Sequence, residues 1–347
     1  MRLLTVATSN YLHFVDVLFD SVRRVHPELR LTVLVADCSH DKLTAVTDAL
    51  GPDVDALCCD DLGFDFIEDM REYYTPLEFC SALKVLGSAY ILKKEESCLF
   101  LDPDMIVYDS LIDSVLDQSG QLVACCHSFS PFRKDGYGPE DLEFCLTGHM
   151  NGGVLFSRNT ASGTPALDWL VEKTKYQWFL APELGMYADQ QWLSALPYLF
   201  RNQMTLVLDR GVNVAYWNLH ERPLRRENPE APVILSPSEP LRLMHFSGFK
   251  IGLSGRLTQH SNRVFDAETQ VILEEMVDDY EKKLIIAHAR LSHLKGNLFF
   301  SNLPLINRLK LAEKRWHVSG LTDSASFIQK LIQNLQNLLE RINKSFK

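Results

Sequence analysis

Residues 98–108 form an apolar run that is interrupted at its centre by two carboxylates, Asp102 and Asp104. An apolar run of this length predicts a strand buried in an α/β sheet, where a charge is costly unless a counter-charge or a cation compensates it. In extended backbone, residues two apart point to the same side, so both carboxylates can face one cation. The motif therefore predicts either a divalent-cation site of the Mg²⁺ or Mn²⁺ type or a strand end that the two aspartates cap.

Strand and helix patterns alternate on both sides of this run. Residues 3–7 and 31–36 are short, β-branched strand patterns, and residues 11–25 between them carry apolar positions at helical spacing. A right-handed crossover makes the two strands parallel. The same criteria predict further strands at 56–59, 122–126, 153–156 and 206–208, and further helices at 42–50, 76–92, 166–179 and 189–196. We predict an α/β fold with a mixed, mainly parallel sheet flanked by helices.

The alternation weakens after Val264, where two amphipathic helices are predicted at 267–295 and 324–344. A chain of 347 residues suits one large α/β core with an appendage. We therefore divide the chain into a main α/β domain at residues 1–262 and a helical, basic C-terminal extension at residues 263–347.

Charge is unevenly distributed between these two parts. The chain carries −10 overall, whereas residues 282–347 contain twelve basic and three acidic side chains, a charge of +9. This segment is either a peripheral contact with an anionic membrane or a solvated helical hairpin or dimer contact. The acidic total and the lack of a base-stacking module argue against nucleic acid as a partner.

The cellular location is predicted from the apolar runs and the cysteines. No run reaches about 18 apolar residues, and the N-terminus becomes polar too early for a secretory signal. The eight cysteines show no Cys-x-x-Cys spacing and lie mostly in apolar runs, which favours free thiols over disulfides. We expect a cytoplasmic protein, which either is free in the cytoplasm or lies peripherally at the inner face of the membrane.

Four further segments contain residue types suited to a metal or a phosphate. Asn151-Gly152-Gly153 precedes a predicted strand, and its glycines either let a ligand approach the backbone or form a turn. Asp189-Gln190 opens a predicted helix, where the aspartate is a site residue or an N-cap. His245 offers an imidazole to a metal or serves the core, and Gly248 with Lys250 suits a phosphate.

The fourth segment is Thr8-Ser9-Asn10, which follows the first strand, together with Asp37 after the second. The carboxyl ends of parallel strands are where nucleotides bind in open α/β sheets.

In this order, the motifs Thr-Ser-Asn, a helix bearing Lys84, Leu-Asp-Pro-Asp, Asn-Gly-Gly, Asp-Gln-Gln and His-Phe-Ser-Gly-Phe-Lys resemble the GT-A glycosyltransferases of the retaining family-8 type, which are galactosyltransferase- and glycogenin-like. The resemblance covers residues 1–250. It implies a glycosyltransferase, specifically a hexosyltransferase, that takes a UDP-sugar donor and uses Mn²⁺ or Mg²⁺.

The resemblance also implies a role for each matching residue. Asp102, Asp104 and His245 would hold the metal, and Lys250 with the Gly248 backbone would neutralise the diphosphate. The nucleoside, phosphates and donor sugar would be contacted by Thr8, Ser9, Asn10, Asp37, Lys84, Asn151 and Gly152. Asp189 and Gln190 would line the reaction face as catalytic residues together with Lys250. This chain departs from the family pattern at two places. It has Asp-Gln-Gln where the family has Asp-Gln-Asp, and Ile251-Gly252 where the family has Pro-Trp, so the choice of sugar stays open.

The resemblance implies transfer with retention, in which a metal and Lys250 stabilise the leaving diphosphate. The acceptor would be a sugar, glycan, glycolipid or glycoprotein. Residues 128–149 are either an acceptor-binding loop or a solvated loop, with Phe129, Phe132, Arg133, Lys134 and Tyr137 as the candidates. Two alternatives are a sugar nucleotidyltransferase, which would need a glycine- and arginine-rich N-terminal loop, and a nucleotide-sugar-binding protein without transferase activity.

Overall fold

The computed structural model describes residues 1–132, 134–235, 239–253, 255–318, 329–330 and 332–337. Its helices are α1 (Leu12–Val25), α2 (Leu43–Leu50), α3 (Ile67–Tyr73), α4 (Pro76–Leu92), α5 (Asp141–Thr147), α6 (Pro165–Thr174), α7 (Ala188–Leu199), α8 (Ala267–Leu291) and α9 (Leu305–Val318). Its strands are β1 (Arg2–Ala7), β2 (Arg30–Val35), β3 (Val54–Leu57), β4 (Ser97–Leu101), β5 (Met105–Val107), β6 (Leu122–Cys126), β7 (Met150–Arg158), β8 (Leu180–Ala181), β9 (Met186–Tyr187), β10 (Met204–Leu206), β11 (Leu224–Arg225), β12 (Ile234–Leu235), β13 (Glu239–Pro240) and β14 (Leu243–His245).

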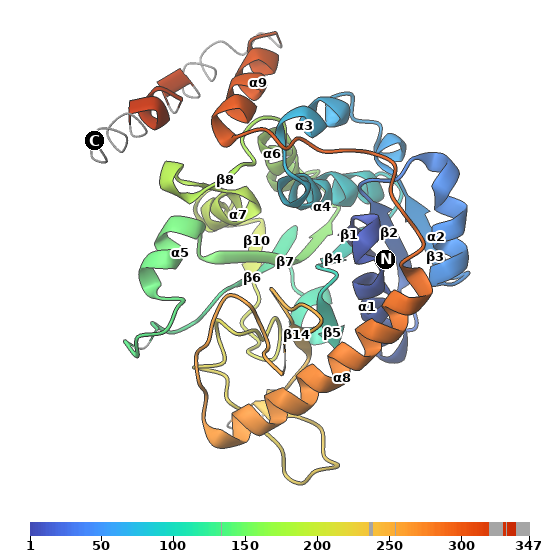
Figure 1. Cartoon of the computed structure of the whole chain (residues 1–347), viewed down its shortest axis with the longest axis vertical. Coiled ribbons are helices and arrows are strands. Elements are labelled where there is room, and N and C mark those ends of the chain that lie inside the picture. The colour runs from blue at the N-terminus through green and yellow to red at the C-terminus, as the bar shows by residue number, and fades with distance from the viewer. Residues whose placement is uncertain (133, 236–238, 254, 319–328, 331, 338–347) are drawn as a thin grey trace.

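A seven-stranded sheet in the order β10-β6-β7-β4-β1-β2-β3 forms the centre of the molecule (Figure 1). The pairs β1–β2, β2–β3, β1–β4 and β10–β6 are parallel, and β7 runs antiparallel to both of its neighbours. The prediction of a mixed, mainly parallel α/β sheet flanked by helices is confirmed.

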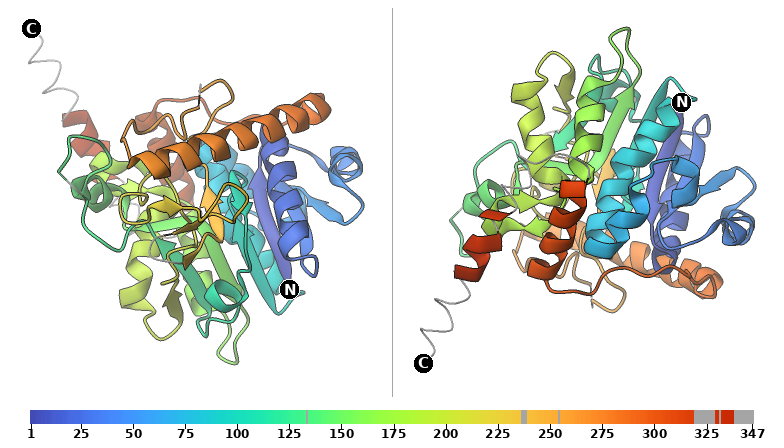
Figure 2. Two further views of the ribbon diagram at one scale, coloured as in Figure 1. Left: turned by 90° about the horizontal axis from the view of Figure 1, so that it is seen from below. Right: turned by 90° about the horizontal axis from the view of Figure 1, so that it is seen from above.

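Helices cover both faces of this sheet because alternate strand residues enter different cores. In β1, Leu4 packs in a core shared with α4, α6 and α7, whereas Leu3 packs in a core shared with α1 and α2. The views from below and above separate the two helical layers (Figure 2).

The local rules that predicted α4 also fix its first residue. Pro76 occupies the first turn, and the Thr75 hydroxyl accepts a hydrogen bond from the Glu78 N–H. The Glu78 carboxylate in turn accepts one from the Thr75 N–H at 2.7 Å, which completes a capping box. This helix places Lys84 beneath the carboxyl ends of the central strands.

The single strand predicted at residues 98–108 is two strands in different sheets, which corrects the sequence prediction. β4 ends at Leu101, Asp102 to Asp104 form a turn, and β5 pairs antiparallel with β14 outside the main sheet. The turn forms because aspartate and proline favour turns and because proline has no N–H to donate to a strand ladder.

Smaller differences lie at element ends and in connections. α6 ends at Thr174 and α8 at Leu291, both short of the predicted 179 and 295, and the predicted loop at 128–149 contains α5. The patterns also missed α3, α9 and the short strands β8, β9 and β11 to β14.

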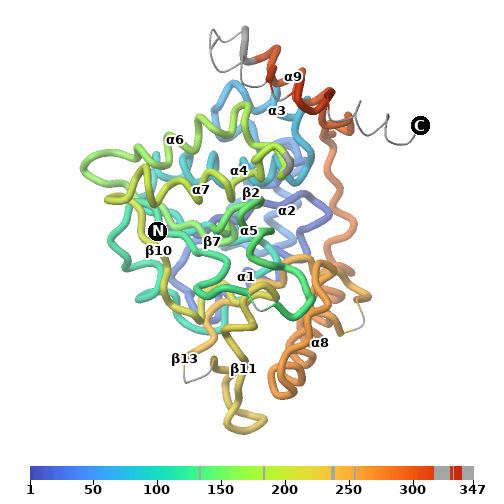
Figure 3. The backbone as a smooth tube through the Cα atoms, turned by 90° about the vertical axis from the view of Figure 1, so that its left-hand side faces the viewer, coloured from blue at the N-terminus to red at the C-terminus, as the bar shows by residue number. Residues whose placement is uncertain are grey.

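The C-terminal helices share their apolar faces with the sheet domain. α8 packs against α1, where the rings of Tyr280 and Phe14 have centroids 6.2 Å apart, and Tyr280 also stacks on Phe246 with centroids 4.0 Å apart. The connection after α8 passes along the carboxyl ends of β1 and β2 before α9 packs against α3, and Figures 1 and 3 show this path. The boundary at residues 262 and 263 stays a prediction.

Much of the predicted helix 324–344, and with it several of the basic residues of the C-terminal segment, lies outside the described residues. None of the described helices combines the length and the apolar character that crossing a membrane requires. All eight cysteines are free, as predicted, and Cys145 is exposed.

Candidate active site

The Asp102 and Asp104 carboxylates lie in the turn between β4 and β5, together with the imidazole of His245. His245 is the last residue of β14 and pairs with Met105 of β5, and the Phe246 N–H donates to the Asp104 carbonyl at 2.8 Å. His245 Nε2 is 3.1 Å from Asp104 Oδ1 and 4.0 Å from Asp102 Oδ2. Two carboxylates and one imidazole within 4.8 Å of one another form a donor set suited to Mn²⁺.

Asn213 determines which nitrogen of His245 faces this cluster. Its side-chain amide donates from Nδ2 to Asn151 Oδ1 at 3.1 Å, so its Oδ1, 3.0 Å from His245 Nδ1, is an acceptor. His245 therefore carries its proton on Nδ1 when neutral and presents the Nε2 lone pair to the two carboxylates. Asn213 adopts the left-handed conformation with φ 59°, which asparagine tolerates better than most residues. Burial lowers the pKa of His245, but the Asp104 charge and hydrogen bond outweigh it, so the pKa is raised when no cation is present.

Lys84 of α4 supplies a buried positive charge beside this cluster. Its Nζ lies 3.0 Å from Asp189 Oδ2, 3.4 Å from Asp102 Oδ1 and 3.1 Å from the Gly152 carbonyl oxygen. Burial alone would lower the pKa of Lys84, but the charges of Asp102 and Asp189 raise it above its usual value. Lys84 therefore stays charged and joins the predicted metal ligand Asp102 to the predicted reaction-face residue Asp189.

Asp189 opens α7 and is almost fully buried, with its other oxygen, Oδ1, accepting from the Ser81 hydroxyl at 3.0 Å. The preceding residue, Ala188, has φ 45°, a conformation that costs energy for a residue with a Cβ. A Cβ at Gly152 would lie 1.6 Å from Asp189 Oδ2. The glycine at position 152 is thus needed to admit the Asp189 carboxylate.

Gly153, the second glycine of this motif, is also required because side chains pack against its backbone. A Cβ at Gly153 would lie 2.8 Å from His245 Cε1 and 2.6 Å from Met105 Cε. Asn151 is buried, and its Oδ1 also accepts from the Gly153 N–H at 3.0 Å. The motif therefore places two protein side chains, Asp189 and His245, against the backbone. Its contact with a donor sugar stays a prediction.

Gly248 and Lys250 follow β14 in a turn close to His260. Gly248 has φ 74°, and a Cβ there would meet the His260 ring at 2.2 Å, so this position favours glycine. Lys250 is exposed, and its charge lowers the pKa of His260 in addition to the lowering by burial. Gln190 follows Asp189 in α7, and its carbonyl group packs against Gly148.

The nucleoside-binding residues predicted from the sequence lie at the carboxyl ends of β1 and β2. The Ser9 N–H and hydroxyl donate to the two Asp37 carboxylate oxygens at 2.7 and 2.8 Å, and Thr8 donates to Asn10 Oδ1 at 2.6 Å. The connection between α8 and α9 lies across Asp37, because the Asn297 N–H donates to the Asp37 carbonyl at 2.9 Å. This connection thus forms a cover over Asp37. The sequence patterns did not predict the cover, because Asn297 and Asp37 are 260 residues apart.

His127 is a site residue that sequence reasoning missed. It follows β6, is buried, and lines a cavity of about 220 Å³ together with Phe132 and Phe144. Asn151 Nδ2 lies 3.4 Å from His127 Nε2, which makes Nε2 the acceptor and leaves the proton on Nδ1. This Nδ1 is buried in the protein, and a hydrogen bond to the His149 backbone partly offsets the lowering of the His127 pKa by burial. The available signal was a histidine placed directly after a buried strand.

The candidate acceptor loop surrounds this cavity. Phe129 lines it as well, whereas the Tyr137 carbonyl binds the Arg263 guanidinium at 2.8 Å, and Arg133 lies outside the described residues. Trp217 is buried, and its ring contacts the rings of His127 and His245.

This chain matches no family model. It is 25% identical over 193 residues to the uncharacterised protein YfnF of Bacillus subtilis strain 168, a match that covers 52% of this chain and 60% of YfnF. The aligned part thus spans less than two thirds of that relative.

Among solved structures, the chain resembles the galactosyltransferase LgtC in complex with donor and acceptor sugar analogues, at 19% identity and a TM-score of 0.48, over 82% of this chain and 100% of LgtC. It also resembles mouse xyloside xylosyltransferase 1, at 16% identity and a TM-score of 0.41, over 70% of this chain and 96% of the mouse protein. The glycosyltransferase GlyE of Streptococcus pneumoniae matches at 15% identity and a TM-score of 0.44, over 84% of this chain and 62% of GlyE. These three solved structures are glycosyltransferases, and each is less than 20% identical to this chain.

Proposed function

We propose that this protein is a metal-dependent hexosyltransferase that moves a hexose from a UDP-sugar to a carbohydrate-bearing acceptor. The observation that carries the proposal is the Asp102, Asp104 and His245 cluster at the carboxyl end of β4, with the Nε2 lone pair of His245 directed by Asn213. Open α/β sheets bind nucleotides at this edge, and the donor set suits a cation that holds a diphosphate.

The three residues of this cluster would hold Mn²⁺ or Mg²⁺. When bound, the cation would act as a Lewis acid that stabilises the negative charge on the departing diphosphate. Burial raises the pKa of Asp102, and Lys84 would favour its ionised form against this effect, because the Lys84 Nζ lies 3.4 Å from Asp102 Oδ1. Lys250 is exposed and would add a second positive charge where the diphosphate leaves, beside the Gly248 backbone.

On the sugar side, Lys84 and Ser81 hold the Asp189 carboxylate in one orientation, with its two oxygens 3.0 Å from their donors. Asp189 would orient the donor sugar, and Gln190 would face the anomeric carbon. We propose front-face transfer with retention, in which a leaving phosphate oxygen takes the proton of the acceptor hydroxyl. Assignment of the product anomer by NMR tests this step, and an inverted product would exclude it.

The cavity beside His127 is the proposed acceptor site. His127 lines this cavity, and Phe132 and Phe144 offer apolar faces on which a sugar ring can stack. We therefore propose a sugar, free or joined to a glycan, lipid or protein, as the acceptor.

The test is a panel of UDP-sugars, screened by thermal shift with and without Mn²⁺, followed by measurement of UDP release. We expect one donor to raise the melting temperature only with metal and to be turned over. Asp104→Asn should abolish turnover while the protein stays folded, and Asp48→Asn, the same change at an exposed position on α2, should not. Turnover that persists in Asp104→Asn would overturn the metal assignment.

The same panel separates the two alternative functions. Tight binding of a UDP-sugar without turnover, for any acceptor tried, would favour a binding protein. Formation of a UDP-sugar from UTP and a sugar phosphate would favour a nucleotidyltransferase.

A further inference from the structure

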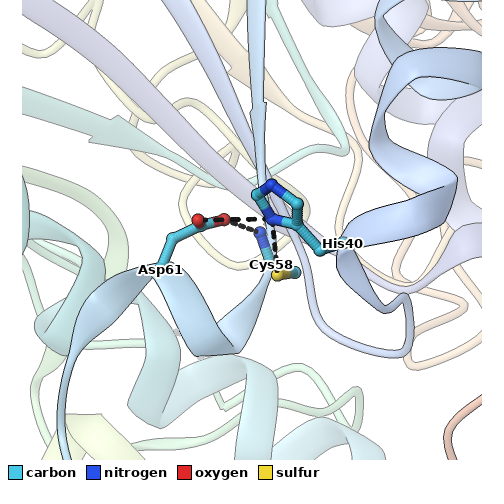
Figure 4. Close-up of side chains that lie close together, drawn as sticks. All are labelled: His40, Cys58 and Asp61. Atoms are coloured by element: carbon cyan, nitrogen blue, oxygen red, sulfur yellow. Dashed lines mark hydrogen bonds and ion pairs between the residues drawn. The ribbon is translucent and has the colours of Figure 1, made fainter.

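A second group of potential metal ligands lies at the carboxyl ends of β2 and β3, apart from the proposed active site. His40 begins the turn His40–Lys42 after β2, Cys58 follows β3, and Asp61 lies in the turn Cys59–Leu62. Figure 4 shows the His40 ring directed at both the Cys58 sulfur and the Asp61 carboxylate. The group thus joins two loops that the sequence keeps 18 residues apart.

The spacing of the ligand atoms is close to that of a tetrahedral site. His40 Nδ1 lies 3.9 Å from Cys58 Sγ and 3.5 Å from Asp61 Oδ1, and all three ligand atoms lie within 4.8 Å of one another. With zinc bonds of about 2.3 Å to sulfur and about 2.1 Å to nitrogen and oxygen, a tetrahedron separates S from N by about 3.6 Å and N from O by about 3.4 Å. The two distances from His40 Nδ1 are thus within a few tenths of an ångström of those in a tetrahedral site.

The surroundings of the Cys58 sulfur favour a bound thiolate. The Asp60 and Asp61 N–H groups point at the sulfur, as the first turn of a short helix does toward its cap. The Cys58 N–H donates to Asp61 Oδ2 at 2.8 Å, so the carboxylate is already turned toward the sulfur. Burial and the nearby Asp61 charge raise the pKa of the Cys58 thiol, and a cation between the two groups would reverse that effect.

We propose that His40, Cys58 and Asp61 form a site for Zn²⁺ or a cation of the same class. A thiolate and an imidazole select such a cation, whereas the two carboxylates near His245 suit Mn²⁺ or Mg²⁺. The His40 side chain is 74% exposed, so water can occupy the fourth position. Binding replaces the thiol proton by the metal and releases that proton to the solvent.

The site would fix the loop that holds the cover over Asp37. In this loop, the Ser39 N–H donates to Asn297 Oδ1 at 3.1 Å, and Asn297 Nδ2 donates to the Ser39 hydroxyl at 2.7 Å. Lys42 Nζ reaches the Lys295 carbonyl at 3.4 Å. A cation that ties His40 to β3 would therefore also stabilise the connection between α8 and α9.

The experiment is a titration of the full chain with Co²⁺, whose bond to a thiolate gives a sulfur-to-cobalt charge-transfer band. The cluster of Asp102, Asp104 and His245 contains no sulfur, so cobalt bound there does not produce this band. We expect one equivalent of Co²⁺ to develop the band, Zn²⁺ to displace it, and Cys58→Ser to abolish it. Serine keeps an oxygen at the cap position, so this variant should stay folded.

Two variants serve as controls, and a third weakens the site. Cys38→Ser changes a buried thiol of the same loop, and His293→Ala changes an exposed histidine, and both should keep the band. His40→Ala should weaken Co²⁺ binding by about tenfold or more. No charge-transfer band in the wild-type protein, or an unchanged band in Cys58→Ser, would overturn the proposal. Neither result would depend on glycosyl transfer.

Discussion

Replacement of Lys84 by methionine tests the charge balance of the candidate active site. The lysine Nζ is the counter-charge of Asp189 at 3.0 Å and of Asp102 at 3.4 Å, and only 8% of the Lys84 side chain is exposed. Methionine keeps the apolar stem of the side chain and removes the charge. The loss of stability therefore reports the cost of leaving the two carboxylates without that cation.

The expected loss of stability follows from how deeply the two carboxylate partners of Lys84 are buried. Breaking a buried ion pair typically costs about 3–5 kcal/mol. Asp189 is 9% exposed and would keep only its hydrogen bond from Ser81, whereas Asp102 is 26% exposed and can recruit water. One of the two carboxylates thus bears most of the cost, and we expect Lys84→Met to lower the free energy of unfolding by about 3 kcal/mol.

The assay is equilibrium unfolding in urea with an unchanged slope, which attributes the change to stability. Lys175→Met is the control, because Lys175 pairs with the exposed Glu172 at 2.8 Å and such pairs contribute about 0–1 kcal/mol. Asp189→Asn combined with Lys84→Met should lose less than the sum of the two single changes. Mn²⁺ should restore part of the loss by supplying another positive charge beside Asp102.

A loss in Lys84→Met no larger than that in Lys175→Met would refute this reasoning. Additivity of Lys84→Met and Asp189→Asn would likewise show that the pair does not interact.

Three further predictions concern other parts of the molecule. Asn213→Ala should weaken Mn²⁺ binding by about 10–100-fold in a calorimetric titration, because the tautomer of His245 is no longer held; unchanged affinity would contradict the role of Asn213. The pKa of His127 is lowered to about 4, mainly by burial; the nearby charges of His245 and His149 also lower it, and that of Asp189 raises it. As the pH falls, the unfolded chain therefore binds a proton at this histidine before the folded protein does. Stability should accordingly fall between pH 6.5 and 4, by up to about 3 kcal/mol, and this contribution should vanish from unfolding curves of His127→Gln. Arg308→Met should cost about 3–5 kcal/mol in urea unfolding, because it leaves the fully buried Glu78 without the guanidinium of α9, and a loss below 1 kcal/mol would show that α9 is dispensable.

The sequence by itself determined those elements whose signals are local. The apolar pattern of residues 76–92 predicted α4, and the apolar run at 122–126 predicted β6, because helical and buried-strand patterns depend on neighbours within a few residues. The motifs for metal and phosphate were found because their residue types are costly without a partner.

Only the tertiary structure decided which of these residues meet. His245 reaches Asp104 through the pairing of β5 with β14, more than 130 residues further along the chain, and Asn213 reaches His245 from a third segment. The glycine at position 152 is explained by Asp189, and the cover over Asp37 by Gly296 and Asn297. Such contacts depend on how separate elements pack, and packing is set by the sum of many long-range interactions that no local pattern contains.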